Sequence, residues 1–382
     1  MKRHKSAWRS VVLALFFLEA VVEALRGTGG TLFRPKISPI VKLTNGGPRI
    51  AAELAPDNPL VGLANQFGNG IGLYGPLRSA IGTPPNSNAL KTMTEPHDRG
   101  AILVAAVFDA FFTIFVRRTS DLWRISGMSR DEATDVDLHP DLLVRLANEA
   151  SKTAGHFETL CIRALDYCPA VDITFGDYLR ALITADHDLV RDDDLGYRTA
   201  LIDAFRLRGI QPEGVTSYSE EALLWCPPER PVMLEGLRML TPNISDEERQ
   251  EIQKGNAAKI FSFAQANTDL LGITDVKRIS VHSFHHIHRV GPDGQLLFEM
   301  VAQVIEKEPA NDDKDSVATF GGVTLLFNQG GGIRYCVRKS LRNERGENQA
   351  AFRREFWAST SLGAYEPHEN APIDFRAIHR GF

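Results

Sequence analysis

The sequence predicts an α+β protein in which a mainly α-helical region, residues 95–225, is followed by a small α+β domain, residues 226–382. Three patterns support this prediction. Residues 101–116 form an apolar run, residues 141–209 repeat apolar side chains at every third or fourth position, and residues from Val276 onward alternate apolar with polar. The first two patterns are typical of buried and amphipathic helices, and the third is typical of β-strands.

The composition is that of an ordinary globular protein. Of the 382 residues, 43% are hydrophobic and 24% are charged, and the net charge is −5. Such a chain is long enough for two or three domains with cores of their own. The acidic balance, with no basic run beyond the N-terminal KRHK, disfavours a nucleic acid as partner.

Residues 1–94 are expected to form an N-terminal helix and an irregular, glycine-rich region. The first 25 residues open with basic side chains and continue as an apolar segment interrupted by Glu19 and Glu23. An amphipathic helix of a cytoplasmic protein explains this segment, and a cleaved signal peptide of a secreted protein is the alternative. The glycines between residues 62 and 75 lack the Gly-Lys-Ser/Thr of a phosphate loop, so we predict no nucleotide cofactor.

Residues 95–118 are expected to contain the central helix of the helical region. The apolar run from Ala101 to Val116 includes Asp109, and its sixteen residues fall short of the roughly 20 that cross a bilayer. We therefore expect a buried core helix and no membrane span. His97 lies at the polar entrance of this helix, where the helix dipole disfavours protonation and suits a hydrogen-bonding role. The alternative is a loop residue packed on the helix start.

Three further helices are expected between residues 141 and 209. Apolar side chains of residues 142–161 form one stripe, Thr174 is positioned to cap the next helix, and Gly209 is positioned to end the third. The acidic run 192–194 lies between the last two helices. Its consecutive carboxylates do not alternate as calcium ligands do, so we expect a solvated connector that starts a helix.

The α+β domain is expected to contain a helix and two β-hairpins. Ser245, followed by acidic residues, predicts a helix start. Residues 279–290 and 295–308 alternate on either side of a Gly-Pro-Asp-Gly turn, and a second hairpin turns at the glycines 330–332. The tail from residue 343 onward receives no assigned role.

The first predicted strand carries a cluster of histidines. On a strand, His282, His286 and His288 would share one face and His285 would lie on the other. Three imidazoles can bind zinc, but neighbouring side chains of one strand converge poorly, and no carboxylate in this segment completes the shell. The three histidines are therefore weak candidates for metal ligands, and an exposed hairpin face is the alternative.

No nucleophile stands out in the sequence. The Gly-x-Ser-x-Gly pattern of serine hydrolases does not occur. Cys161 and Cys168 lie in apolar helical contexts, which raise the pKa of a thiol and make it less reactive. All four cysteines are expected to be free thiols, because none forms a Cys-x-x-Cys pair.

The residues around His97 carry a resemblance to a known family. His97, Gly100, Ile102 and Phe108 resemble the His, Gly, Ile and buried aromatic that lead into a helix of the thermolysin-like, or gluzincin, zinc metallopeptidases. Residues 163–190 and 200–210 resemble the closing helices of that family, so the resemblance covers roughly residues 60–210. It implies the fold of the family's C-terminal lobe, a peptide or protein substrate, and an oxyanion-stabilising position for His97.

The chain departs from this family at the metal site. The family binds zinc through His-Glu-x-x-His, in which two histidines hold the metal and the glutamate activates water, and this pentapeptide does not occur here. Glu19 and Glu23 at best echo the family's third ligand, and Gly100 lies one residue nearer His97 than in the family. Zinc is the family's cofactor, but no cofactor is predicted for this chain alone.

The sequence thus predicts a truncated or catalytically inactive zinc peptidase homologue that retains a peptide-binding helical lobe. One alternative is an active zinc metalloendopeptidase whose metal-binding half lies on another chain or upstream of this start. The other is a non-enzymatic helical interaction protein. No oligomeric state is predicted.

Overall fold

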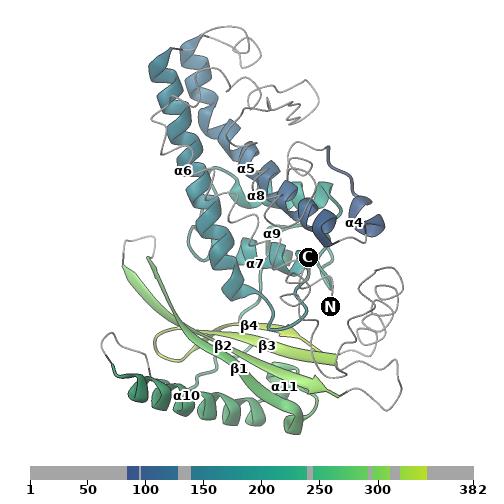
Figure 1. The fold of residues 1–382 in the computed structure, drawn as a ribbon, viewed down its shortest axis with the longest axis vertical. Coiled ribbons are helices and arrows are strands. Elements are labelled where there is room, and N and C mark those ends of the chain that lie inside the picture. Colours follow the sequence, from purple (N-terminus) through teal and green to yellow (C-terminus); the bar gives the residue numbers. More distant parts are fainter. Residues whose placement is uncertain are drawn as a thin grey trace, which may run out of the picture. The chain divides into compact units, whose positions relative to one another are not determined.

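The computed structural model describes residues 84–93, 96–127, 139–238, 244–290, 295–309 and 319–341. These residues form helices and one antiparallel four-stranded sheet, which confirms the predicted α+β class (Figure 1). The predictions for residues 1–83, including Glu19 and Glu23, lie outside the described residues. The same holds for the Gly-Pro-Asp-Gly turn and the tail after Leu341.

Two compact units divide the chain. The helical unit comprises the described residues up to Leu165 together with Thr174–Leu224, and the sheet unit comprises Asp166–Ile173 together with the described residues from Trp225 onward. The helices of the helical unit are α4 (Ala89–Thr92), α5 (Pro96–Ser126), α6 (Pro140–Ala164), α7 (Phe175–His187), α8 (Tyr197–Leu207) and α9 (Glu220–Leu223). Helix α5 packs against α6 and α8, and α7 packs against α6, α8 and α9.

Helix α5 is the core helix that the apolar run predicts. Leu103, Ala106, Ala110 and Ile114, spaced three or four residues apart, are completely buried. The helix continues beyond the apolar run to Ser126. By length and composition alone the stretch Arg99–Ser126 could cross a membrane, but 67% of its apolar window is buried inside the protein. Burial against α6 and α8 is the expected environment of a core helix in a folded unit.

Asp109, the charged residue within this apolar run, forms an ion pair. Arg208, which directly follows α8, places Nη2 2.7 Å and Nε 2.8 Å from Oδ2 of Asp109. Burial raises the pKa of Asp109, whereas the charge and hydrogen bond of Arg208 act in the opposite direction. The ion pair explains how a carboxylate is accommodated in an otherwise apolar helix.

Local hydrogen bonds set the predicted helix boundaries. Thr174 caps α7 in a reciprocal pair with Asp177. Oγ1 of Thr174 accepts from the Asp177 N–H at 3.0 Å, and Oδ2 of Asp177 accepts from the Thr174 N–H at 2.9 Å. Asp193 accepts from the first two backbone N–H groups of α8, at 2.6 and 2.9 Å. The acidic run is therefore a connector that starts a helix, as predicted. Gly209 follows α8 with a φ of 69°, in the left-handed region that favours glycine.

The sheet unit is an antiparallel meander covered by a helix. Its strands follow the order β1-β2-β3-β4, and α10 packs against β1 and β2 on one face (Figure 1). Its elements are α10 (Asp246–Ala266), α11 (Thr268–Leu271), the 3₁₀-helix η5 (Val276–Arg278), β1 (Ile279–Val290), β2 (Leu296–Glu308), β3 (Thr319–Phe327) and β4 (Ile333–Lys339). Ser245 caps α10 by accepting from the Glu248 N–H at 3.1 Å, as predicted.

Both faces of the sheet are buried. Ile260 of α10 belongs to one apolar core with Ala302 of β2 and Leu325 of β3. Val301 and Leu326 alternate with these positions and are also completely buried, on the opposite face. Burial of apolar side chains on both faces stabilises these central strands.

A short segment between α6 and α7 belongs to the sheet unit. Thr324 of β3 donates a hydrogen bond from Oγ1 to the carbonyl of Cys168 at 2.8 Å. A Cβ atom at Gly322 would lie 3.2 Å from the Cβ of Ala170 and 2.8 Å from the carbonyl oxygen of Val304, so the close approach requires glycine. This segment lies within the helical region predicted for residues 95–225, because its neighbours on both sides are helices.

Candidate functional site

His97 lies in the first turn of α5, which begins at Pro96. The backbone N–H groups of a first helical turn are unpaired within the helix and create a positive local field. The sequence prediction that this histidine stands at a helix entrance is consistent with the helix bounds. Its role at an oxyanion stays a prediction.

The histidine-bearing strand β1 contains an irregularity that the sequence does not reveal. The pairing with β2 shifts register between Val281 and Ser283, so His282 is an extra residue in a β-bulge. His286 lies opposite Met300 and His288 lies opposite Phe298, so these two share a face. The prediction of a three-histidine face assumed regular alternation from His282 to His288. One inserted residue reverses the side of every later position, so the bulge removes His282 from that pattern.

The rings of the remaining histidines have separate neighbours. His286 contacts Phe284 edge to face with 5.2 Å between ring centroids, and His288 contacts Phe298 in the same way at 5.0 Å. His285 places Nε2 3.2 Å from a carboxylate oxygen of Asp166. Burial lowers the pKa of His286, and the nearby His288 and His285 lower it further, which favours a neutral imidazole.

The zinc implied by the resemblance does not fit the described residues. Within the ranges that the structure describes, no three His, Cys, Asp or Glu side chains lie together as a metal site would require. The three histidine candidates are split by the bulge, and His97 stands on a different unit. We derive no catalytic step through zinc.

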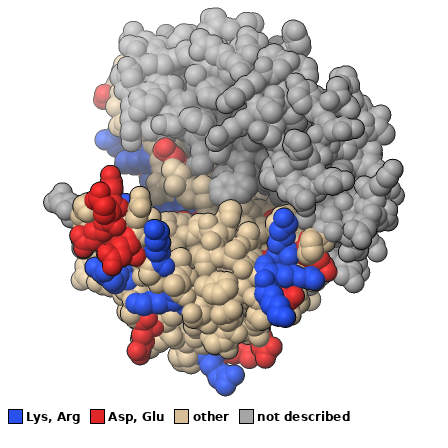
Figure 2. All heavy atoms as spheres, turned by 60° about the horizontal axis from the view of Figure 1, so that its bottom comes forward, with Lys and Arg blue, Asp and Glu red and all other residues tan. Residues whose placement is uncertain are grey.

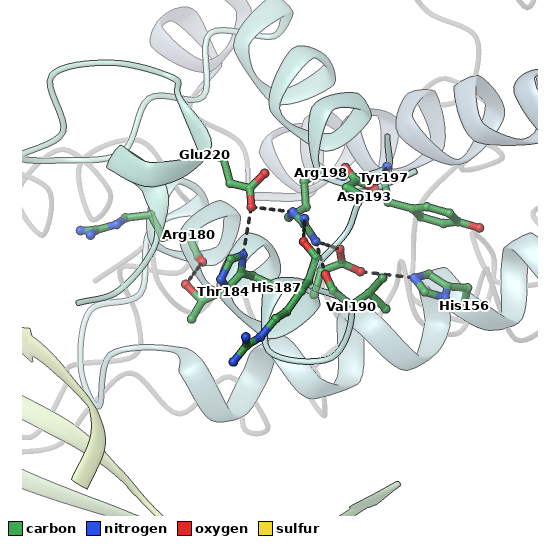
Figure 3. A network of polar contacts seen from close by, with 11 residues as sticks. His156, Arg180, Thr184, His187, Val190, Asp193, Tyr197, Arg198 and Glu220 are labelled. Atoms are coloured by element: carbon green, nitrogen blue, oxygen red, sulfur yellow. Dashed lines mark hydrogen bonds and ion pairs between the residues drawn. The ribbon is translucent and has the colours of Figure 1, made fainter. Parts of the chain in front are cut away.

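The helical unit contains a buried ion network centred on Arg198 of α8 (Figure 3). The side chain of Arg198 is 3% exposed. Its Nη1 lies 2.9 Å from Oδ2 of Asp186, at the end of α7, and its Nε lies 2.8 Å from Oε1 of Glu220, in α9. The same guanidinium donates to the carbonyls of Val190 at 2.7 Å and Arg191 at 2.8 Å. One side chain therefore fastens α7, α8, α9 and the α7–α8 connection together.

A half-exposed histidine stands at each end of this network (Figure 3). His187 places Nδ1 3.0 Å from Oε1 of Glu220, and His156 of α6 places Nε2 3.4 Å from Oδ1 of Asp186. The chain of contacts runs from His187 through Glu220, Arg198 and Asp186 to His156. A carboxylate that accepts from Nδ1 fixes the ring orientation of His187, an arrangement also used where histidine transfers protons.

The neighbouring carboxylates favour the charged form of Arg198 despite its burial. Burial acts against the charge of Arg198, but the hydrogen bonds and charges of Glu220 and Asp186 outweigh it and raise the pKa of Arg198. An arginine held by two carboxylates and two carbonyls acts as a structural cation. This network was not predictable from the sequence, because Asp186, Arg198 and Glu220 belong to three different helices.

Comparisons with known proteins do not extend these observations. No family model, curated protein or solved structure matches the chain.

The sheet unit also buries an arginine. Arg289 of β1 pairs with Glu299 of β2, and Arg334 of β4 pairs with the same carboxylate. Arg289 also donates to the hydroxyl of Tyr167 and lies over its ring, with 5.4 Å between Cζ and the centroid. This cluster fastens the segment between α6 and α7 to the strands, and it leaves Glu299 with two cations.

A shallow cavity of about 450 Å³ lies on the exposed side of α10. Leu234, Ala258, Lys259, Ser262, Phe263, Ala266 and Asn267 line it. Figure 2 shows a mainly uncharged middle on this face, with acidic side chains gathered at one end, over the start of α10, where Asp246, Glu247 and Glu248 form the first turn. The cavity has apolar walls and one lysine, and it brings together no pair of acid and base for catalysis.

Burial makes the thiols of Cys161 and Cys336 unreactive. All four cysteines are free, and burial raises the pKa of Cys161 to about 12 and that of Cys336 to about 11. This agrees with the prediction that the apolar context of Cys161 disfavours its thiolate. Neither thiol is suited to act as a nucleophile at neutral pH.

Proposed function

We propose that this chain is a metallopeptidase-like protein whose helical unit binds peptides without hydrolysing them. The observation that supports this proposal is the position of His97 at the start of α5. His97 stands in the first turn of a helix whose body is the core of the unit, the position that the gluzincin resemblance assigns to the oxyanion-stabilising histidine. The residues that resemble the family's closing helices, 163–190 and 200–210, include helix α7 and most of helix α8.

The missing His-Glu-x-x-His motif supports binding without cleavage. In zinc peptidases the metal supplies both the activated water and most of the charge stabilisation. A histidine that donates to an oxyanion contributes only when that oxyanion forms. This polypeptide lacks the motif that binds the metal, so its helical unit is proposed to hold peptides in their ground state.

Equilibrium binding of fluorescein-labelled casein peptides to the zinc-replete full chain tests this proposal. We expect saturable fluorescence anisotropy, no new peptide products by mass spectrometry, and far less than one zinc per chain by elemental analysis. Absence of binding at every accessible protein concentration would contradict the proposal. Cleavage by a protein that holds one zinc per chain would instead favour the active metallopeptidase, provided that His97→Ala abolishes the cleavage.

The Arg198 network favours a second candidate, a non-enzymatic helical interaction protein. Its charged groups hold α7, α8 and α9 together and are occupied by one another. A unit stabilised in this way presents its outer helix surfaces to a partner and needs no reactive group. Binding of a folded protein partner, with no binding of casein peptides, would support this candidate.

A further inference from the structure

The cavity beside α10 is walled in part by Leu234, which lies in the segment 232–238. Hydrogen bonds hold this segment in place. The Leu234 N–H donates to the carbonyl of Gly331 at 2.9 Å. Farther along, the buried side chain of Asn256 on α10 accepts from the Arg238 N–H at 2.9 Å and donates to the Arg238 carbonyl at 2.8 Å. Because the segment is fixed at both ends, the cavity is formed before a ligand arrives.

Lys259 of α10 places a positive charge at this cavity. Its Nζ donates to the carbonyl of Gly236, within the segment 232–238. Gly236 has a φ of 75°, and a Cβ atom there would lie 3.0 Å from Nζ of Lys259, so glycine permits this close approach. A lysine on a helix surface ordinarily samples many rotamers, whereas this bond restricts the ammonium group. The described residues that line the cavity include no aspartate or glutamate to neutralise it.

The remaining lining of the cavity is mostly apolar. Its apolar members are Leu234, Ala258, Phe263 and Ala266, and its uncharged polar members are Ser262 and Asn267. Ser262 follows Lys259 by three residues on α10, so the two side chains share one side of the helix. An ammonium group can only donate hydrogen bonds, and a hydroxyl group can donate one. Two donors, one of them charged, beside apolar walls favour a ligand with an apolar body and an anionic acceptor.

We propose that this cavity binds a small apolar carboxylic acid in its ionised form. The carboxylate pairs with Lys259, and the hydrocarbon or aromatic body contacts Leu234 and Phe263. The volume of about 450 Å³ falls within the range of small-molecule sites, roughly 300–1,000 Å³. Charge complementarity selects the acid over a neutral molecule of the same shape. This inference is independent of the proposed peptide-binding function, because the cavity belongs to the sheet unit.

Ligand-observed NMR titration of the full chain with 2-naphthoate and with the uncharged 2-naphthamide tests the proposal. We expect saturable binding of 2-naphthoate at about millimolar concentration, as is usual for so small a ligand. The amide should bind about fivefold more weakly, because it forms no ion pair. Lys259→Met should reduce the affinity for 2-naphthoate to that of the amide. The matched control, Lys254→Met, removes an exposed cation of α10 that does not line the cavity and should change neither affinity.

A second variant, Ala258→Trp, tests where the ligand binds. Ala258 is exposed and lines the cavity, so tryptophan at this position fills the cavity without entering the core. It should abolish binding of both ligands while the far-UV circular dichroism stays unchanged. Equal affinities for the acid and the amide would overturn the proposal. So would an absence of binding, binding that survives Ala258→Trp, or an equal loss of affinity in Lys254→Met and Lys259→Met.

Discussion

Each unit buries an arginine that pairs with an acidic side chain, but the partners of the two arginines lie at different distances along the chain. In the helical unit, the partners of Arg198 all lie between Asp186 and Glu220. In the sheet unit, Arg289 reaches Tyr167, which precedes it by 122 residues. The helical network can therefore form with its own helices, whereas the sheet network requires a segment that arrives from between α6 and α7.

The largest effect is expected when the helical network loses its cation. Arg198→Ala leaves Asp186, whose side chain is 3% exposed, without its guanidinium partner. Removing one partner of a buried ion pair typically lowers the free energy of unfolding by about 3–5 kcal/mol. Urea unfolding measures this loss. The matched control is Arg206→Ala on the same helix, since its ion pair with Asp203 is half-exposed and should contribute less than about 1 kcal/mol. Equal losses in the two variants would contradict the central role of Arg198.

A smaller loss is expected from the corresponding change in the sheet unit. Arg289→Met removes the bond to Tyr167 and one of the two cations on Glu299, while Arg334 remains. We expect a loss of about 2 kcal/mol in the free energy of unfolding, because the carboxylate keeps a partner. If Arg289→Met proves more harmful than Arg198→Ala, Arg334 does not compensate as proposed.

The link to the remote segment can be measured by a double-mutant cycle. Tyr167→Phe removes only the hydroxyl that accepts from Arg289 and should cost about 1 kcal/mol. Combined with Arg289→Met, it should cost little more than Arg289→Met alone, since the two side chains share one interaction. Additive losses would show that the segment is not held through this contact.

Thiol labelling of the folded chain perturbs it least. The labelling rates of buried cysteines compare how readily each unit exposes its interior to solvent. Cys226 is exposed and should react first with a disulfide reagent at neutral pH. Because the thiolate is the reactive form, raising the pKa of Cys161 from 9.0 to about 12 lowers its thiolate fraction at neutral pH roughly a thousandfold. We expect Cys336 of the sheet unit to react before Cys161 of the helical unit. Labelling of Cys161 as fast as that of Cys226 would contradict the closed helical core.

Local signals in the sequence were sufficient for the main elements. Thr174, Ser245 and Gly209 mark helix boundaries because capping depends on side-chain and backbone preferences within a few residues. The apolar run of α5 and the alternation of β1 and β2 are likewise visible, since burial on one face imposes the period of the element.

Features that depend on distant residues were not predictable from the sequence. The bulge at His282 inserts one residue without changing the composition of the strand, so the predicted three-histidine face could not be tested by pattern alone. Arg198 resembles any helical arginine until Asp186 and Glu220 are placed beside it. The association of Asp166–Ile173 with the sheet depends on tertiary contacts such as that between Thr324 and Cys168.

Photo-crosslinking of a casein peptide pool to the full chain, with the attachment sites mapped by mass spectrometry, tests the proposed function most directly. Peptide binding by the helical unit predicts saturable attachment within residues 96–224, competed by unlabelled peptides, with the peptides recovered intact. Attachment confined to residues 225–341, or none that can be competed, would contradict it.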